Sequence, residues 1–223
     1  MRIVDLSVPV RSGMQVYPGD PPVAIRPATQ LATDGVNVLA VHAGSHTGTH
    51  VDAPFHLLAG GARLDELDLR LFHGPAVVAD LRGLPARAAI DWPLLAPYAP
   101  RLRPGVVLVL HTGWSEHFGT PEYLEHPWLT PAAAEGIVAN GVRTVALDAL
   151  SPDPTPPPDA QGPDDGFPAH HALLGAGAVI VENLTNVAAL TELPDPVISC
   201  FPLALAGADG APVRAVAMAG PGR

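Results

Sequence analysis

Five side chains that can bind a metal ion or transfer a proton lie between positions 42 and 56. Neutral imidazoles and carboxylates are suitable ligands for zinc, manganese or iron, and an Asp can bridge two ions through its two oxygens. All five are separated by even numbers of residues, which turns them to one side of an extended backbone. Four of them follow the first glycine, Gly44: His46, His50, Asp52 and His56. This spacing predicts a metal centre.

The segment must bend if its histidines are to share an ion. A straight strand would separate residues 46 and 50 by about 13 Å, whereas each imidazole binds at about 2.1 Å. Gly44 and Gly48 provide the freedom to bend, and Pro54 fixes the exit of the chain. Chance clustering of unrelated histidines is the alternative, and the density of the cluster favours metal binding. His42 precedes the first glycine and could equally be a hydrogen-bonded neighbour of the site.

A second group of candidates lies near residue 180. Glu182 ends an apolar run, where an unpartnered buried carboxylate would cost several kcal/mol or stay protonated. Glu182 therefore needs a cation, either a metal ion or the guanidinium of Arg143 or Arg214. His170 and His171 lie on a short predicted helix upstream, about 100° apart around its axis, so at most one of them faces the site. The spacing does not choose between them.

The elements that must position these residues are mostly strands. Apolar, β-branched runs between Gly and Pro residues predict strands over 3–8, 36–42, 76–81, 106–111, 143–148, 178–182, 197–205 and 213–218. Helices are predicted from Pro131 to Asn140, with Thr130 as N-cap, and from about Pro168 to Leu174. This pattern favours a mixed α/β domain over a regular doubly wound sheet. The proline-rich stretch 151–166 is predicted to be a long loop beside the site.

Composition narrows the class of protein. The 223 residues are 48% hydrophobic and 15% charged, which fits one packed domain over residues 1–223. A net charge of -10 without a basic run argues against nucleic acid as a partner. No signal peptide or membrane span is recognised, so a cytoplasmic protein is expected. Cys200 is the only cysteine, which excludes an internal disulfide and predicts a buried, inert thiol.

These residues resemble the cyclase family of metal-dependent hydrolases, which contains bacterial kynurenine formamidases and isatin hydrolases. The family signature His-x-Gly-Thr-His-x-Asp-Ala-Pro-x-His matches residues 46–56 at every defined position. Further similar segments occur along most of the chain: Asp5-Leu-Ser, Tyr17-Pro-Gly-Asp20, Thr112-Gly-Trp114, Asp148 to Asp153, and Glu182-Asn-Leu-Thr-Asn186 twelve residues after His170.

The resemblance implies a fold, cofactors and residue roles. The fold would be of the swivelling β/β/α type, a single α/β domain with a mixed sheet and few helices, assembled as a homodimer or homotetramer. His56 would be the general acid and base. Two ions per subunit are implied, Zn²⁺ or Mn²⁺, the first on His46, His50 and Asp52 and the second on Asp52, His170 and Glu182.

The activity implied is hydrolysis of a small amide by metal-activated water, as in the conversion of N-formylkynurenine to kynurenine and formate. Hydrolysis of a lactam or another cyclic amide or ester, as in isatin hydrolases, is the alternative. A metal-binding protein without catalysis would keep the ligands but would not need His56. A serine hydrolase is disfavoured because the sequence contains no Gly-x-Ser-x-Gly elbow.

Three aromatic residues are candidates for binding a planar, aromatic substrate. Only 5% of the residues in the chain are aromatic. The three candidates each lie in a Gly- or Pro-rich context: Tyr17, Trp114 and Phe118. Family formamidases usually carry Trp where Tyr17 stands, which leaves the substrate open. The alternative is that each residue only covers an edge of the core.

Overall fold

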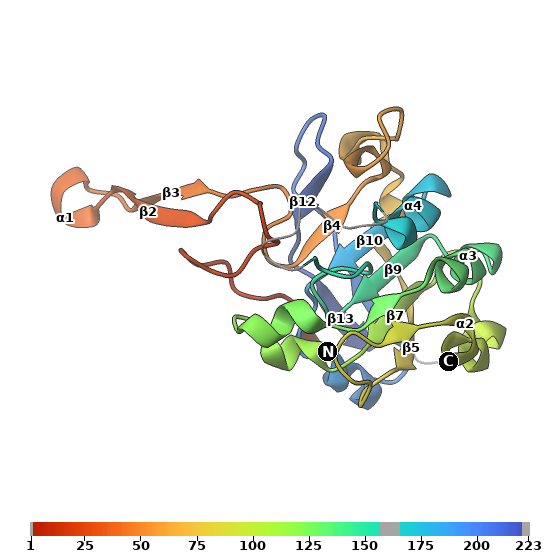
Figure 1. Ribbon diagram of the computed structural model, residues 1–223. Helices are drawn as coiled ribbons and strands as arrows, with labels where there is room; N and C mark the ends of the chain where they lie inside the picture. Colours follow the sequence, from red (N-terminus) through yellow and green to blue (C-terminus); the bar gives the residue numbers. More distant parts are fainter. Residues whose placement is uncertain (1, 157–165, 220–223) are drawn as a thin grey trace.

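The computed structural model describes residues 2–156 and 166–219 and is built on one nine-stranded mixed sheet (Figure 1). The four central strands β5, β7, β9 and β10 run parallel, and the outer strands pair antiparallel. In spatial order the strands are β1 (Ile3–Asp5), β13 (Val216–Ala219), β11 (Pro196–Ser199), β5 (His73–Asp80), β7 (Val107–His111), β9 (Thr144–Leu147), β10 (Val179–Glu182), β4 (His50–Asp52) and β12 (Gly210–Pro212).

The centre of the sheet is buried on both faces. Every residue of β7 is buried, as the continuous apolar sequence of a central parallel strand predicts. Because side chains alternate along a strand, Val107 and Val109 enter one apolar cluster, and Leu108 and Leu110 enter another on the opposite face. The predicted α/β class with a mixed sheet and few helices is therefore confirmed.

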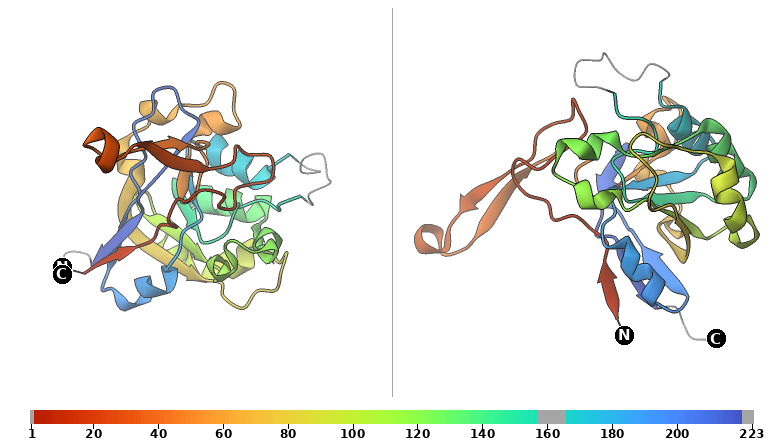
Figure 2. Two further views of the ribbon diagram at one scale, coloured as in Figure 1. Left: turned by 90° about the vertical axis from the view of Figure 1, so that its left-hand side faces the viewer. Right: turned by 60° about the horizontal axis from the view of Figure 1, so that its bottom comes forward.

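Three α-helices cover one face of this sheet: α2 (Trp92–Leu95), α3 (Pro131–Ala139) and α4 (Pro168–Gly175) (Figures 1 and 2). The Thr130 hydroxyl accepts a hydrogen bond from the Ala133 N–H, so α3 begins at its predicted cap. Short 3₁₀ helices join the other elements: η1 (Pro54–His56), η2 (Leu64–Glu66), η3 (Leu69–Phe72), η4 (Ala96–Arg101), η5 (Trp114–His117), η6 (Pro121–Glu125) and η7 (Val187–Glu192). A two-stranded sheet pairs β6 (Ala89–Ile90) with β8 (Trp128–Leu129).

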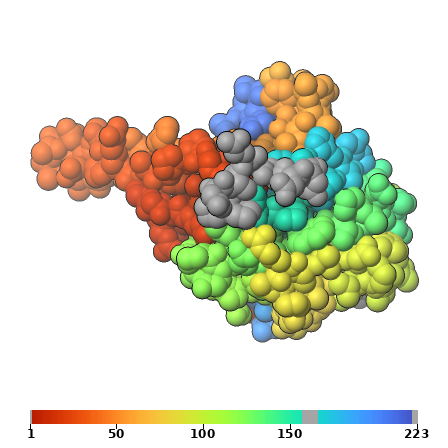
Figure 3. Space-filling view, viewed as in Figure 1, coloured from red at the N-terminus to blue at the C-terminus, as the bar shows by residue number. Residues whose placement is uncertain are grey.

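A hairpin projects from the body of the molecule (Figures 1 and 3). It consists of β2 (Ala24–Thr29), the short helix α1 (Leu31–Asp34) and β3 (Val38–His42), and it contains no buried residue. β3 was predicted from Val36, whereas its partner β2 was missed, because Arg26 and Pro27 interrupt the apolar alternation.

The strand predicted over 197–205 ends at Ser199, because Pro202 cannot donate to a ladder; Phe201, Leu203 and Leu205 are exposed. Residues 151–156 are irregular, as predicted, and the remainder of the proline-rich stretch up to 165 lies outside the described residues. Among the described residues, no helix is both long enough and apolar enough to cross a membrane.

Candidate metal centre

The histidine-rich segment folds as a bend, a short strand and a helical turn. Gly48 adopts a φ of +63°, in the left-handed region that glycine favours, and lies at a bend of the chain between His46 and His50. Strand β4 then spans only His50–Asp52, and Pro54 opens the turn η1 that carries His56. The bend predicted from the glycines is present at Gly48.

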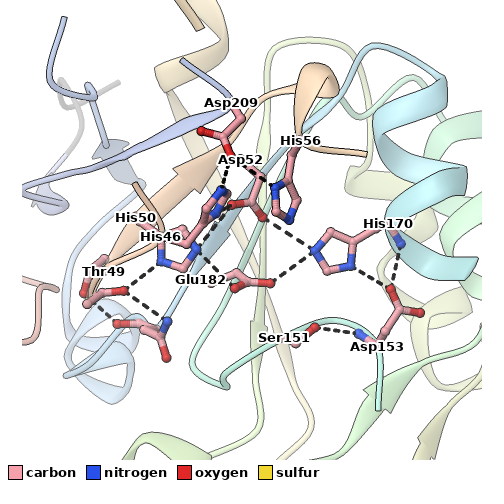
Figure 4. A network of polar contacts seen from close by, with 12 residues as sticks. His46, Thr49, His50, Asp52, His56, Ser151, Asp153, His170, Glu182 and Asp209 are labelled. Carbon is pink, nitrogen blue, oxygen red and sulfur yellow. Dashed lines mark hydrogen bonds and ion pairs between the residues drawn. The ribbon is translucent and has the colours of Figure 1, made fainter. Parts of the chain in front are cut away.

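Sheet register brings the distant carboxylate to this segment. β4 pairs antiparallel with β10, and His50 lies directly opposite Glu182. The first turn of α4 adds His170, so three elements meet at the carboxyl end of β10 (Figure 4). The His50 Nε2 atom lies 3.2 Å from Asp52 Oδ1 and 3.2 Å from Glu182 Oε2. The His170 Nε2 atom lies 3.4 Å from Glu182 Oε1 and 3.6 Å from Asp52 Oδ2.

These separations fit ligands of a shared ion better than hydrogen bonds. Tetrahedral ligands at about 2.0–2.1 Å from an ion lie about 3.3 Å from one another. Three of the atoms are buried and have no hydrogen-bond partner: His50 Nε2, Asp52 Oδ2 and Glu182 Oε1. Because an orphaned buried polar atom is costly, this arrangement calls for a cation. Three groups have ligand atoms within 4.8 Å of one another, and two of them are triads that contain these orphaned atoms: His46, His50 and Asp52, and Asp52, His170 and Glu182. The third group is His46, His56 and Asp209.

Each histidine of the two triads has its other ring nitrogen occupied. His50 Nδ1 lies 2.8 Å from the Gly48 carbonyl oxygen. His170 Nδ1 lies 2.7 Å from Asp153 Oδ2, and His46 Nε2 lies 2.9 Å from Asp209 Oδ2. A metal-binding histidine typically donates its second N–H to such an oxygen, which fixes the ring and its tautomer. His46 Nδ1 is the exception to the long separations, since it lies 2.7 Å from Asp52 Oδ1.

Charge in the cluster is balanced between imidazoles and carboxylates. Burial opposes protonation of His46, but hydrogen bonds to Asp209 and Asp52 outweigh it and raise its pKa to about 9. The same balance of burial against carboxylates raises the pKa of His50 and of His170. The carboxylates thus stabilise positive charge in the cluster, either as protons on the imidazoles or as bound metal ions.

His56 behaves differently from its neighbours. Burial lowers its pKa, which favours the neutral imidazole at pH 7. Its ring packs on that of His46, with centroids 4.0 Å apart, and faces His170 at 5.9 Å. A neutral imidazole at the edge of the cluster can accept a proton.

Neither arginine pairs with Glu182. The Arg143 guanidinium donates to the carbonyl oxygens of Val138 and Val142, and Arg214 pairs with Asp5. The contacts of the Glu182 carboxylate are instead with His50 and His170. The arginine alternative is therefore excluded.

A cavity of about 370 Å³ opens onto the cluster, a size suited to one small molecule. Tyr17, Asp20 and Phe167 line it together with His56. The rings of Tyr17 and Phe167 are 6.3 Å apart, and Phe167 meets His170 edge-on at 5.6 Å. The Tyr17 hydroxyl is buried without a hydrogen-bond partner, and burial together with the nearby carboxylate of Glu182 raises its pKa. Tyr17 therefore presents a protonated donor to this cavity.

Comparison with known proteins identifies the family. Residues 4–154 match the Cyclase family model, described as "Putative cyclase". The chain belongs to this family. A kynurenine formamidase from Geobacillus thermodenitrificans (strain NG80-2) is 35% identical over 214 residues, covering 95% of each chain.

Solved structures share the cyclase-family fold. Isatin hydrolase A from Labrenzia aggregata superimposes with a TM-score of 0.85 at 24% identity, covering 98% of this chain and 93% of that one. A structure titled a potential metal-dependent hydrolase with cyclase activity gives a TM-score of 0.76 at 26% identity, covering 97% and 96% of the two chains. The family match ends at residue 154, before His170 and Glu182, and the relative at 35% identity extends the likeness over nearly the whole chain.

The structure shows which of the predicted site residues lie together. It brings together all of the predicted ligands and His56, and Tyr17 lines the cavity. Among the histidines left open, His170 faces the cluster, whereas His171 and His42 are exposed. The converging residues are His46, His50, Asp52, His56, His170 and Glu182.

Trp114 and Phe118 do not line the cavity. The Trp114 indole N–H donates to the Glu122 carbonyl, and its ring packs against the core beneath the helices. Phe118 packs edge-on against Tyr123 at 5.1 Å. Their segment supports the cavity wall indirectly, through hydrogen bonds of the Gln15 side chain to residues 119 and 120. The covering role considered as the alternative therefore fits both residues.

The sequence prediction missed three groups at the site. Phe167 has a signal that could have revealed it, since it immediately precedes the helix that carries His170. Asp153 accepts the Ala169 and His170 backbone N–H groups, a helix-capping role that local sequence does not reveal across an intervening loop. Asp209 lies at a bend between Ala208 and Gly210, so no adjacent side chain in the sequence marks it as a functional residue.

Proposed function

We propose that this protein is a metal-dependent hydrolase of small amides that acts as an arylformamidase, converting N-formylkynurenine to kynurenine and formate. The observation that carries the proposal is the buried set of orphaned ligand atoms at the floor of a cavity for one small molecule. The kynurenine formamidases at about 35% identity over the whole chain support this substrate class. A lactam hydrolase is the second candidate, which the shared fold of isatin hydrolase A favours.

The donor set suits two Zn²⁺ or Mn²⁺ ions that share Asp52. His46 and His50 would complete the first site, and His170 and Glu182 the second. Metal ions bound there would supply an activated water at neutral pH and would polarise the substrate carbonyl. Nitrogen and oxygen ligands without sulfur do not choose between the two metals.

The residues of the chain supply binding and proton transfer. His56 is neutral and lines the cavity, so it can take a proton from the attacking water and deliver it to the departing nitrogen. Tyr17 and Phe167 form aromatic walls on which a planar ring can stack.

The test is an assay of the metal-reconstituted protein on N-formylkynurenine, isatin, simple amides and lactones. We expect turnover of N-formylkynurenine, its loss on chelation and its recovery with Zn²⁺ or Mn²⁺. Turnover of isatin alone would support the second candidate. Full activity in rigorously metal-free protein would refute the mechanism.

His56→Gln distinguishes an enzyme from a metal-binding protein without catalysis. We expect turnover to fall at least about 100-fold while metal content persists, because general acid–base catalysis contributes about 10²–10⁴-fold. His42→Gln is the matched control, since His42 is exposed and is not among the residues that line the cavity. Equal activity of the two variants would contradict the role of His56.

We also propose that the chain forms a homodimer or homotetramer through the projecting hairpin. An isolated two-stranded ribbon is marginally stable in water, and exposed apolar patches mark interaction surfaces. Leu31, Val36, Val38, Leu39 and Val41 are all exposed there. Residues 24–42 carry only one Arg and one Asp in a chain with a net charge of -10, so pairing copies through this segment limits their repulsion.

The oligomer is tested by light scattering on the variant with Leu39→Asp and Val41→Asp. We expect dissociation to monomers, because both side chains are more than half exposed and would be buried in the interface. Leu69→Asp, at a leucine that is 66% exposed on the body, is the control and should not dissociate. A monomeric wild type would refute the proposal.

A further inference from the structure

Asp209, which immediately precedes β12, contacts two histidines of the site, His46 and His56 (Figure 4). One of its oxygens, Oδ2, lies 2.9 Å from His46 Nε2 and 3.6 Å from His56 Nδ1. The rings of these two histidines, whose centroids are 4.0 Å apart with a tilt of 39° between their planes, therefore lie against one carboxylate. Carboxylates that accept an N–H from a metal-binding histidine fix its tautomer and raise its basicity.

The backbone of β12 is built to hold this contact. Gly210 pairs with Asp52 across the β12–β4 ladder, and the Asp209 carbonyl accepts the Ala53 N–H at 2.8 Å. A Cβ atom on Gly210 would lie 2.8 Å from His46 Cε1 and 2.6 Å from the Val51 carbonyl oxygen. Only glycine lets the His46 ring lie this close to β12, where its Nε2 atom meets the carboxylate.

We propose that Asp209 is a positioning residue that sets the proton location on both histidines. With its proton on Nε2, His46 presents the lone pair of Nδ1 toward Asp52, which is the side of the proposed ion. At 3.6 Å, beyond hydrogen-bond distance, the charge of the same carboxylate favours a proton on Nδ1 of His56, which leaves Nε2 as the proton acceptor. One carboxylate thus aligns a metal ligand and the general base.

The short contact argues against a further ion on Asp209 itself. His46 Nε2 and Asp209 Oδ2 are 2.9 Å apart, which is an ordinary hydrogen-bond distance and is shorter than the 3.2–3.6 Å separations of His50 Nε2 and His170 Nε2 from their carboxylate oxygens. Among the candidate metal ligands in the described residues, the orphaned atoms lie on His50, Asp52 and Glu182, not on His46, His56 or Asp209.

This inference rests on the proposed metal centre, so the experiment measures the zinc dissociation constant by chelator competition. We expect Asp209→Ala to weaken zinc binding by about 10–100-fold, and Asp209→Asn by less, because its amide oxygen can still accept the His46 proton. Asp65→Ala is the matched control. It removes a carboxylate that holds the same turn through the Gly207 N–H, without touching a histidine. We expect it to stay within about twofold of wild type.

A second readout is the tautomer itself, observed by NMR of ¹⁵N-histidine-labelled, zinc-loaded protein. We expect His46 to carry its proton on Nε2 in the wild type and to lose this preference in Asp209→Ala. Wild-type His46 protonated on Nδ1, a zinc dissociation constant unchanged in Asp209→Ala, or equal weakening by Asp65→Ala would each overturn the inference alone. A wild type that does not bind zinc would overturn the proposed metal centre, and this inference with it.

Discussion

Asp153 offers a sharp test of how the second triad is held. Its side chain is fully buried and accepts three hydrogen bonds from α4. Oδ1 accepts the Ala169 N–H at 2.8 Å, and Oδ2 accepts the His170 N–H at 2.9 Å and lies 2.7 Å from His170 Nδ1. The carboxylate thus caps the first turn of the helix and orients His170 at the same time.

The effect of Asp153→Asn follows from these contacts. The amide oxygen can keep the two donors of His170, but the amide NH₂ then faces the Ala169 N–H and leaves it unsatisfied, which costs about 1–3 kcal/mol. The two hydrogen bonds from His170 would also change from charge-assisted to neutral, at a cost of about 1 kcal/mol each. Removing a buried charge offsets part of this, so we expect a net loss of about 2–3 kcal/mol. For a chain of this size that lowers the Tm by about 4–12 °C.

Thermal unfolding of the metal-free protein measures this loss, and chelator competition measures the accompanying loss of zinc affinity, expected to be about 10–100-fold. Asp68→Asn is the control, because Asp68 is exposed and caps η3 through the Arg70 N–H, a role that Asn fills as well. A Tm within 2 °C of wild type, or unchanged zinc affinity, would refute the reasoning.

Three further outcomes are expected. Tyr17→Ala should raise KM for aryl amides about tenfold through lost stacking and burial, with little effect on small aliphatic amides; equal losses on both would indicate a role in the fold instead. Burial raises the pKa of Cys200 to about 12, so the protonated thiol should resist a thiol reagent at pH 8 until the protein is denatured, and rapid labelling of the native protein would contradict this. Gly136→Ala should lower the Tm by several degrees, since its Cβ would lie 2.3 Å from Trp92 Cε3. An unchanged melting curve would show that the Trp92 ring can move aside.

Local features of the structure were readable from the sequence because they depend on near neighbours. The apolar run of β7 and the Thr130 cap of α3 are set by side-chain burial and by a hydrogen bond three residues away. The density of histidines likewise predicted a metal centre, and Gly48 marked the bend within it. For β7, the α3 cap and the bend at Gly48, the deciding feature lies within a few consecutive residues.

Contacts between distant segments were decided only by the tertiary structure. The antiparallel register of β4 on β10 sets His50 opposite Glu182, and the rotation of α4 selects His170 over His171. Asp209 meets His46 across 163 positions in the chain, and nothing near Asp209 in the sequence marks it. A one-residue slip in a sheet moves every side chain to the other face, so such partners depend on register and packing, which local patterns do not encode.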